Sequence, residues 1–181
     1  MARDVVVGLL RAVNVGGRKL TSAQLRETAE RLGYTDVKTY VNSGNVVLAS
    51  SDGAAQVADA LSAALTDEAG FAVPVITRTA REWHAIVEAL PFPDEARDDP
   101  SHLVVVTWDG PVSASAQSFD PARYGPERLQ WRSHELYAYY PDGQGRSKLT
   151  LPILEKAAGR RGTARNWNTA LALDALVRER E

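Results

Sequence analysis

Two short segments of the sequence combine glycine, basic side chains and the start of an expected helix. They are Gly16-Gly17-Arg18-Lys19-Leu20-Thr21 and Gly145-Arg146-Ser147-Lys148-Leu149-Thr150. A helix N-terminus presents unpaired N–H groups and about half a positive charge, so a neighbouring Arg and Lys would complete a site for phosphate or carboxylate. The residue order of a P-loop is absent from both segments. Each segment is therefore interpreted either as part of an anion site or as a solvated turn followed by a capped helix.

A third segment, Arg165-Asn166-Trp167-Asn168, places a guanidinium, two amides and an indole within four residues. Arg165, together with Arg146, could hold an oxyanion through paired hydrogen bonds, while the amides set its orientation. In the alternative interpretation, Asn168 caps a terminal helix and Trp167 packs in the core.

The first half of the chain offers further polar candidates at the ends of expected strands. Arg11 closes a strongly apolar strand beside Asn14, at the kind of edge where α/β proteins often bind ligands, although a structural ion pair explains it equally well. The segment Asn42-Ser43-Gly44-Asn45 suits a hairpin turn, or it supplies amides to the same ligand. We expect folding to gather the predicted ligand-binding residues around one cavity: Arg11, Asn14, Arg18, Lys19, Asn42, Ser43, Asn45, Arg146, Ser147, Lys148, Arg165, Asn166 and Asn168.

Other kinds of chemistry find little support in the residue types. The chain has no cysteine, which excludes a thiolate metal site and a cysteine nucleophile. His84, His102 and His134 lack metal-ligand spacing, and no Ser-His-Asp set can be nominated, so we expect no metal and no cofactor and assign no catalytic residue. Any reaction would be a transfer or hydrolysis assisted by positive charge, since no strong general base is visible.

The charge distribution suggests a second hypothesis, a module that self-associates. The chain has 21 basic and 23 acidic residues, so no overall field draws it to nucleic acid or anionic lipid. Residues 82–109, however, hold seven acids and one base, and residues 141–168 hold six bases and two acids. An acidic face on one copy could therefore meet a basic face on another, giving a homo-oligomer.

A third hypothesis is weak single-stranded nucleic-acid binding through Tyr137 and Tyr139, which share one face of an expected strand. Packing of these rings in the core is the favoured interpretation, because the central apolar strands of the first half, 5–10 and 46–48, carry no aromatic residues. Nucleic acid is accordingly not the preferred partner.

Composition and periodicity indicate an α+β protein. Of the 181 residues, 44% are hydrophobic and 24% charged, which is typical of globular domains and excludes disorder. No apolar run approaches the ~18 residues of a membrane span, and the run 5–10 is too short for a secretory signal, so we expect a cytoplasmic protein without membrane contact.

The element order predicts two ferredoxin-like units of the order β-α-β-β-α-β, duplicated and each followed by a helix. In the first half, strands are expected over 4–12, 37–41, 46–49 and 71–77, with helices over 21–33, 53–70 and 79–90. In the second half, strands are expected over 102–108, 129–131, 136–140 and 162–165, a weak helix or loop over 113–124, and helices over 151–158 and after Asn168. The expected domains are residues 1–93 and 101–181, joined by an acidic linker over 94–100. The acids of that linker lack the spacing of a calcium loop.

Five ordered stretches resemble the bacterial proteins catalogued as domain of unknown function 1697. They are Leu9 to Gly17, Thr39 to Val47, Leu90 to Pro93, Gly145 to Leu149 and Arg165 to Thr169. Asn42 stands where similar proteins often have Gln, which preserves the amide. The resemblance implies a duplicated ferredoxin-like α+β architecture in a bacterial cytoplasmic protein. It implies no reaction, and its stretches coincide with the loops singled out above.

Overall fold

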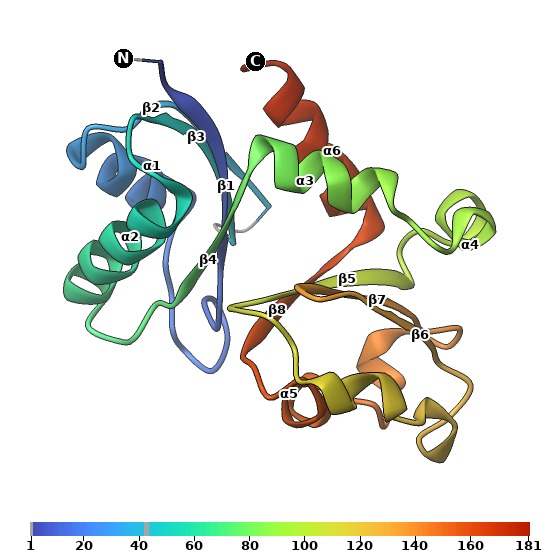
Figure 1. Ribbon diagram of the computed structural model, residues 1–181. Helices are drawn as coiled ribbons and strands as arrows, with labels where there is room; N and C mark the ends of the chain where they lie inside the picture. The colour runs from blue at the N-terminus through green and yellow to red at the C-terminus, as the bar shows by residue number, and fades with distance from the viewer. Residues whose placement is uncertain (1, 42–43) are drawn as a thin grey trace. The chain divides into compact units, whose positions relative to one another are not determined.

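The computed structural model describes residues 2–41 and 44–181 (Figure 1). By its internal contacts the chain divides into unit 1, Met1–Ala85 with Ala172–Glu181, and unit 2, Ile86–Leu171. The division falls inside two helices, α3 (Ala80–Glu88) and α6 (Trp167–Arg178). The segment expected as a linker over 94–100 is instead largely helical, because α4 spans Pro93–Asp98.

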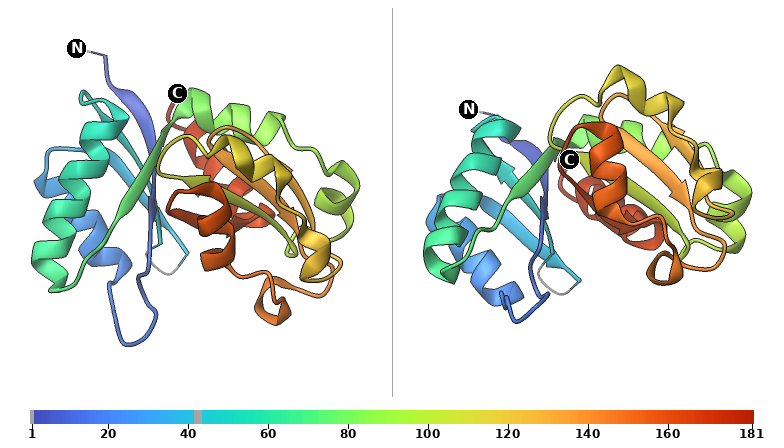
Figure 2. Two further views of the ribbon diagram at one scale, coloured as in Figure 1. Left: turned by 60° about the horizontal axis from the view of Figure 1, so that its bottom comes forward. Right: turned by 90° about the horizontal axis from the view of Figure 1, so that it is seen from below.

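Unit 1 is a four-stranded antiparallel sheet with the strand order β2-β3-β1-β4. Two helices, α1 and α2, lie side by side on one face of this sheet (Figures 1 and 2). The elements in chain order are β1 (Asp4–Leu10), α1 (Ser22–Arg31), β2 (Thr35–Tyr40), β3 (Asn45–Ser50), α2 (Ala54–Ala69) and β4 (Val75–Thr79).

Local sequence signals explain where the helices of unit 1 begin and end. Thr21 and Gln24 form a capping box at the start of α1, each side chain bonding the other residue's backbone N–H. Gly70 ends α2 with φ at 78°, a left-handed conformation that glycine adopts without steric cost. The apolar residues of β1 are buried on both faces of the strand, which accounts for its continuous run of Val and Leu.

Unit 2 is a second four-stranded antiparallel sheet, with the order β6-β7-β5-β8. Its strands are β5 (Leu103–Trp108), β6 (Arg128–Trp131), β7 (Glu135–Tyr139) and β8 (Gly162–Asn166). The helix α5 (Leu151–Ala158) packs on the apolar face, where Trp108 stacks on Trp131 with ring centroids 6.0 Å apart. The stretch 113–124, expected as a weak helix or loop, forms two 3₁₀ turns, η1 (Ala114–Ser118) and η2 (Pro121–Arg123).

The α+β class is therefore confirmed, with two four-stranded antiparallel sheets and six α-helices in the described part of the chain. Each expected strand and helix is present within a few residues of its predicted bounds. Within residues 2–41 and 44–181, no helix is both long enough and apolar enough to span a bilayer.

Candidate functional site

One end of the unit 2 sheet gathers most of the predicted binding residues of that unit. Both β7 and β8 run antiparallel to β5, so both end where β5 begins. The register pairs Leu103 with Tyr139 and Val104 with Asn166. The loop that follows β7 and the segment that follows β8 therefore emerge at the same edge of the sheet, which we call the β5 entry edge.

The loop after β7 is fixed by a buried carboxylate. Ser147 donates a hydrogen bond from Oγ to Glu127 Oε1 at 2.6 Å and accepts one from the Leu149 N–H at 2.9 Å. Glu127 is 8% exposed, and among the described residues its Oε2 is buried without a hydrogen-bond partner. Tyr140 holds the far side of the loop by donating to the Leu149 carbonyl at 3.2 Å. Burial, followed by the charge of Glu127, raises the pKa of Tyr140 to about 12, so this hydroxyl stays a donor.

The two cations of this loop take no part in the hydrogen bonds that fix it. Arg146 ends a 3₁₀ turn, η3 (Gln144–Arg146), and Arg146 and Lys148 are both exposed. In the part of the chain that the structure describes, neither side chain forms an ion pair or a hydrogen bond. The loop therefore presents two uncompensated charges from a backbone that is held in place.

The bracing predicts a specific loss of stability. Ser147→Ala removes both hydroxyl hydrogen bonds and leaves the buried Glu127 carboxylate without this donor, so unfolding should be easier by about 1 to 3 kcal/mol. Urea denaturation measures the change. Ser133→Ala, which removes an exposed hydroxyl bonded to His134, should cost less than about 0.5 kcal/mol. Equal costs for the two variants would mean that Glu127 does not hold the loop.

In the segment after β8, the residue that caps the helix differs from the one that the sequence predicts. Asn166 Oδ1 accepts from the Thr169 N–H at 3.0 Å, so Asn166 caps α6 and the expected cap at Asn168 is wrong. Asn168 lies exposed in the first turn of that helix, while Trp167 is buried as expected. Arg165 Nη1 donates to Thr163 Oγ1 at 2.6 Å and to the Ala164 carbonyl at 2.9 Å. Burial lowers the pKa of the Arg165 guanidinium to about 10, which leaves it charged at neutral pH.

The β5 entry edge also holds a titratable cluster that the sequence analysis missed. Asp99 Oδ2 accepts hydrogen bonds from His102 Nδ1 at 2.9 Å and from the Tyr139 hydroxyl at 2.8 Å. The hydrogen bond to Asp99, followed by burial, raises the pKa of Tyr139. The spacing of Asp99 and His102, three residues apart, was a visible signal, whereas the 40-residue separation of Asp99 and Tyr139 gave none.

In unit 1, the predicted residues lie at the end of β1. The Leu10 N–H donates to the Gly44 carbonyl at 2.9 Å, and the Arg11 N–H donates to the Pro74 carbonyl at 3.0 Å. Arg11 therefore lies beside Pro74, just before β4, while the preceding Leu10 lies beside Gly44. The buried Asn45 uses Nδ2 to bond the Tyr40 carbonyl at 2.9 Å, a structural role in the hairpin. The other two predicted residues of this hairpin, Asn42 and Ser43, lie outside the described residues.

The glycine loop of unit 1 folds back on itself. Asn14 donates its N–H to the Arg18 carbonyl at 2.6 Å and accepts the Leu20 N–H at Oδ1, 3.1 Å away. Asn14 has a positive φ of 57°, as has Ala12. Such conformations are costly outside glycine and cluster at functional sites. Arg18 and Lys19 are exposed at the tip, and neither has an ion pair within the described residues.

The structure thus groups the candidates within each unit. In unit 2, Arg146 to Lys148 and Arg165 to Asn168 lie at the β5 entry edge. In unit 1, Arg11 and the glycine loop follow the end of β1. That the whole set surrounds one cavity stays a prediction.

The two other sequence hypotheses lose support at the side-chain level. Tyr137 is 1% exposed and its hydroxyl donates to the Ile86 carbonyl, so this ring is a packing residue, as favoured. The acidic run of 94–99 is paired internally: Asp94 and Asp98 contact Arg97, and Glu95 contacts Arg128. Self-association stays a prediction that light scattering at low and high salt would test.

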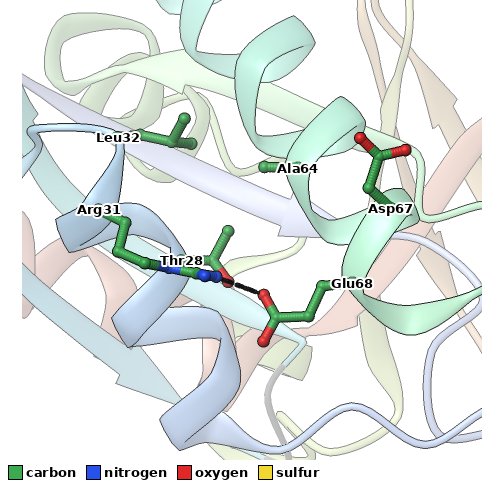
Figure 3. A pocket seen from close by; sticks show the side chains of 6 residues that line it. All are labelled: Thr28, Arg31, Leu32, Ala64, Asp67 and Glu68. Carbon is green, nitrogen blue, oxygen red and sulfur yellow. Dashed lines mark hydrogen bonds and ion pairs between the residues drawn. The ribbon is translucent and has the colours of Figure 1, made fainter.

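Two open hollows lie elsewhere in unit 1. One, of about 490 Å³, runs between α1 and α2, and its Glu68 carboxylate is already bonded to Thr28 and Arg31 at 2.6 Å each (Figure 3). The other, of about 500 Å³, mixes cations with carboxylates; its charged lining is Arg3, Asp4, Arg81, Arg180 and Glu181. The first hollow therefore has its carboxylate and cation paired, and the second sets two carboxylates beside its cations, unlike the two basic loops.

Comparisons with known proteins identify one family and one similar solved structure. The model of a family described as "Protein of unknown function (DUF1697)" matches residues 4–137. No curated protein matches the chain. A solved structure of the conserved bacterial protein SP0830 from Streptococcus pneumoniae is similar to it, with a TM-score of 0.75 and 22% identity, over 97% of this chain and 99% of that one. At this identity the likeness concerns the fold alone.

Proposed function

The chain belongs to the family described as protein of unknown function DUF1697, and from its geometry we propose that it binds a small anionic ligand at the β5 entry edge of unit 2. The ligand would carry phosphate or carboxylate groups, as a nucleotide does. One observation carries the proposal: Arg146 and Lys148 are exposed and unpaired within the described residues, on a loop that a buried carboxylate holds in place.

Bracing of the loop favours binding because the backbone is ordered before the ligand arrives. Arg146 offers a planar fork that matches two oxygens of a phosphate or carboxylate, and Lys148 adds a compact positive charge. The first turn of α6 lies at the same edge, where Asn168 presents an exposed amide. Of the six bases in residues 141–168, Arg165 also lies at this edge, whereas Arg160 and Arg161 precede β8 at the opposite end of the sheet.

The proposal predicts ligand-induced stabilisation that depends on these two cations. Phosphate, a nucleoside monophosphate and citrate, each at about 100 times its dissociation constant, should stabilise the wild type by about 2.7 kcal/mol, seen as a rise in Tm. Arg146→Ala with Lys148→Ala should remove most of this rise, because the exposed side chains contribute to binding and not to packing. Their unliganded Tm should stay close to that of the wild type.

Arg132→Ala is the matched control. Arg132 is exposed in the turn between β6 and β7, at the opposite end of the same sheet. Its loss should leave the ligand-induced rise intact. A rise that survives in the double variant, or that falls equally with Arg132→Ala, would contradict binding at the β5 entry edge.

We also propose that each unit is ferredoxin-like. The two sheets support this because they share one strand order, in which the first strand of the unit lies between its third and fourth. In unit 2, 3₁₀ turns occupy the place of the first helix. The cytoplasmic location stays a prediction.

A further inference from the structure

We propose that His102 is a general base at the β5 entry edge and that the protein hydrolyses a phosphate ester there. This inference rests on the proposed anion site and adds a reaction to it. It revises the sequence interpretation, in which no general base was visible.

The hydrogen bonds around His102 favour one form of the imidazole. Asp99 Oδ2 lies 2.9 Å from His102 Nδ1, and a carboxylate accepts a hydrogen bond, so Nδ1 carries the proton. In the neutral ring, Nε2 then holds the lone pair. This is the arrangement by which a carboxylate orients a catalytic histidine.

The carboxylate that orients His102 is itself held in place. The Tyr139 hydroxyl donates to the same Asp99 oxygen at 2.8 Å, and the Asp99 N–H donates to the Glu95 carbonyl at 2.8 Å. The Tyr139 ring lies under the Arg128 guanidinium, 5.2 Å from its centroid, and Arg128 forms an ion pair with Glu95. The charged and titratable groups around the pair are thus Tyr139, Arg128 and Glu95.

A glycine leaves the reactive nitrogen accessible. A Cβ placed on Gly143 would lie 3.4 Å from His102 Nε2 and 3.7 Å from Cδ2, so a side chain at this position would contact the ring. Gly143 has φ at 86°, which also favours glycine. The His102 side chain is 39% exposed. The turn that contains Gly143 continues directly into Arg146 and Lys148, so the loop that carries the cations passes beside His102.

The reaction needs only water as a co-reactant. Nε2 takes a proton from water as the water oxygen attacks phosphorus, and the bond between phosphorus and the ester oxygen breaks. The departing alkoxide then takes the proton from the His102 imidazolium, giving an alcohol and a phosphate with one ester bond fewer. Arg146 and Lys148 would stabilise the charge on the non-bridging oxygens.

Hydrolysis of p-nitrophenyl phosphate and bis(p-nitrophenyl) phosphate by the full chain tests the inference and distinguishes monoester from diester substrates. His102→Gln should lower kcat/KM by about 100-fold or more, the usual contribution of a general base. It should not lower the phosphate-induced rise in Tm. His134→Gln, in the exposed β6–β7 turn, is the matched control and should retain activity.

Asp99 is a positioning residue, so its test needs a second readout. Asp99→Asn should lower kcat/KM and should also raise the share of His102 protonated at Nε2, which ¹⁵N NMR of the imidazole detects. Absence of turnover with both esters, or equal turnover in wild type and His102→Gln, would overturn the inference. If phosphate still raises Tm in that case, the proposed binding function stands without the reaction.

Discussion

Replacing Gly162 by alanine should destabilise the protein by about 3 kcal/mol, the upper part of the range for overpacked cores. A Cβ at this position would lie 2.5 Å from Trp108 Cε3 and 2.9 Å from the Thr107 carbonyl oxygen. The Trp108 ring is fully buried and stacks on Trp131 at 13°, so it cannot move aside without disturbing the second ring. The carbonyl belongs to β5, at the centre of the sheet.

Urea unfolding followed by tryptophan fluorescence measures this cost as a fall in the midpoint at unchanged m-value. Gly145→Ala is the matched control, because a Cβ there meets nothing within 4 Å and its φ is not left-handed. It should change stability by less than about 0.5 kcal/mol. Trp108→Leu makes room for the new methyl group, so the double variant with Gly162→Ala should cost less than the sum of the single changes. Equal midpoints for the two alanine variants would contradict the close approach of β8 to Trp108.

The strands were predictable because their signals are local. Both β1 and β5 are buried on both faces, which requires an unbroken apolar run whatever packs against them. The helix bounds follow from residues that lie within one turn of each end, such as the capping box of Thr21 and Gln24. No contact between distant parts of the chain is needed to recognise these elements.

The segment 94–100 shows how local signals mislead. Acidic residues and prolines made it resemble a linker, yet α4 occupies most of it. Three of its four carboxylates pair with arginines: Asp94 and Asp98 with Arg97 of the same helix, and Glu95 with Arg128 of β6. Only the first of these partners is visible in the local sequence, so a short polar helix could not be distinguished from a solvated loop.

In the candidate site, the sequence could predict the cations of the loop but not the hydrogen bonds that hold the loop and Asp99 in place. Arg146 and Lys148 are recognised by their place beside glycine in one loop, which needs no tertiary information. The bond that fixes this loop joins Ser147 to Glu127, 20 residues away, and the bond that fixes Asp99 comes from Tyr139, 40 residues away. Strand pairing of β6, β7 and β5 makes both contacts, and no pattern along the chain specifies them.

A contact across 90 residues gives unit 1 a pH-dependent stability. His84 in α3 places Nδ1 at 2.5 Å from Asp174 Oδ1 and Nε2 at 2.9 Å from Glu181 Oε2. Asp174 is buried and also bonds Arg178. A neutral imidazole donates from one nitrogen, whereas the imidazolium donates from both. The hydrogen bond to Glu181, followed by that to Asp174, therefore raises the pKa of His84 above its ordinary value.

The sign of the effect follows from this direction. The folded state holds the His84 proton more tightly than the unfolded chain, so the contribution is complete below the ordinary pKa of 6.5 and is lost as pH rises through the raised pKa. His84→Gln should cost about 2 kcal/mol at about pH 6, a typical value for hydrogen bonds to a charged group, and clearly less at about pH 9. Urea midpoints of the wild type and His84→Gln are compared at each pH across this range. Their difference removes the contribution of the titratable groups that both proteins share.

Glu181→Gln removes the hydrogen bond that raises the pKa of His84 most, so it should move the loss of stability to lower pH. A difference between wild type and His84→Gln that stays constant from about pH 6 to 9 would show that His84 titrates alike in the folded and unfolded chains.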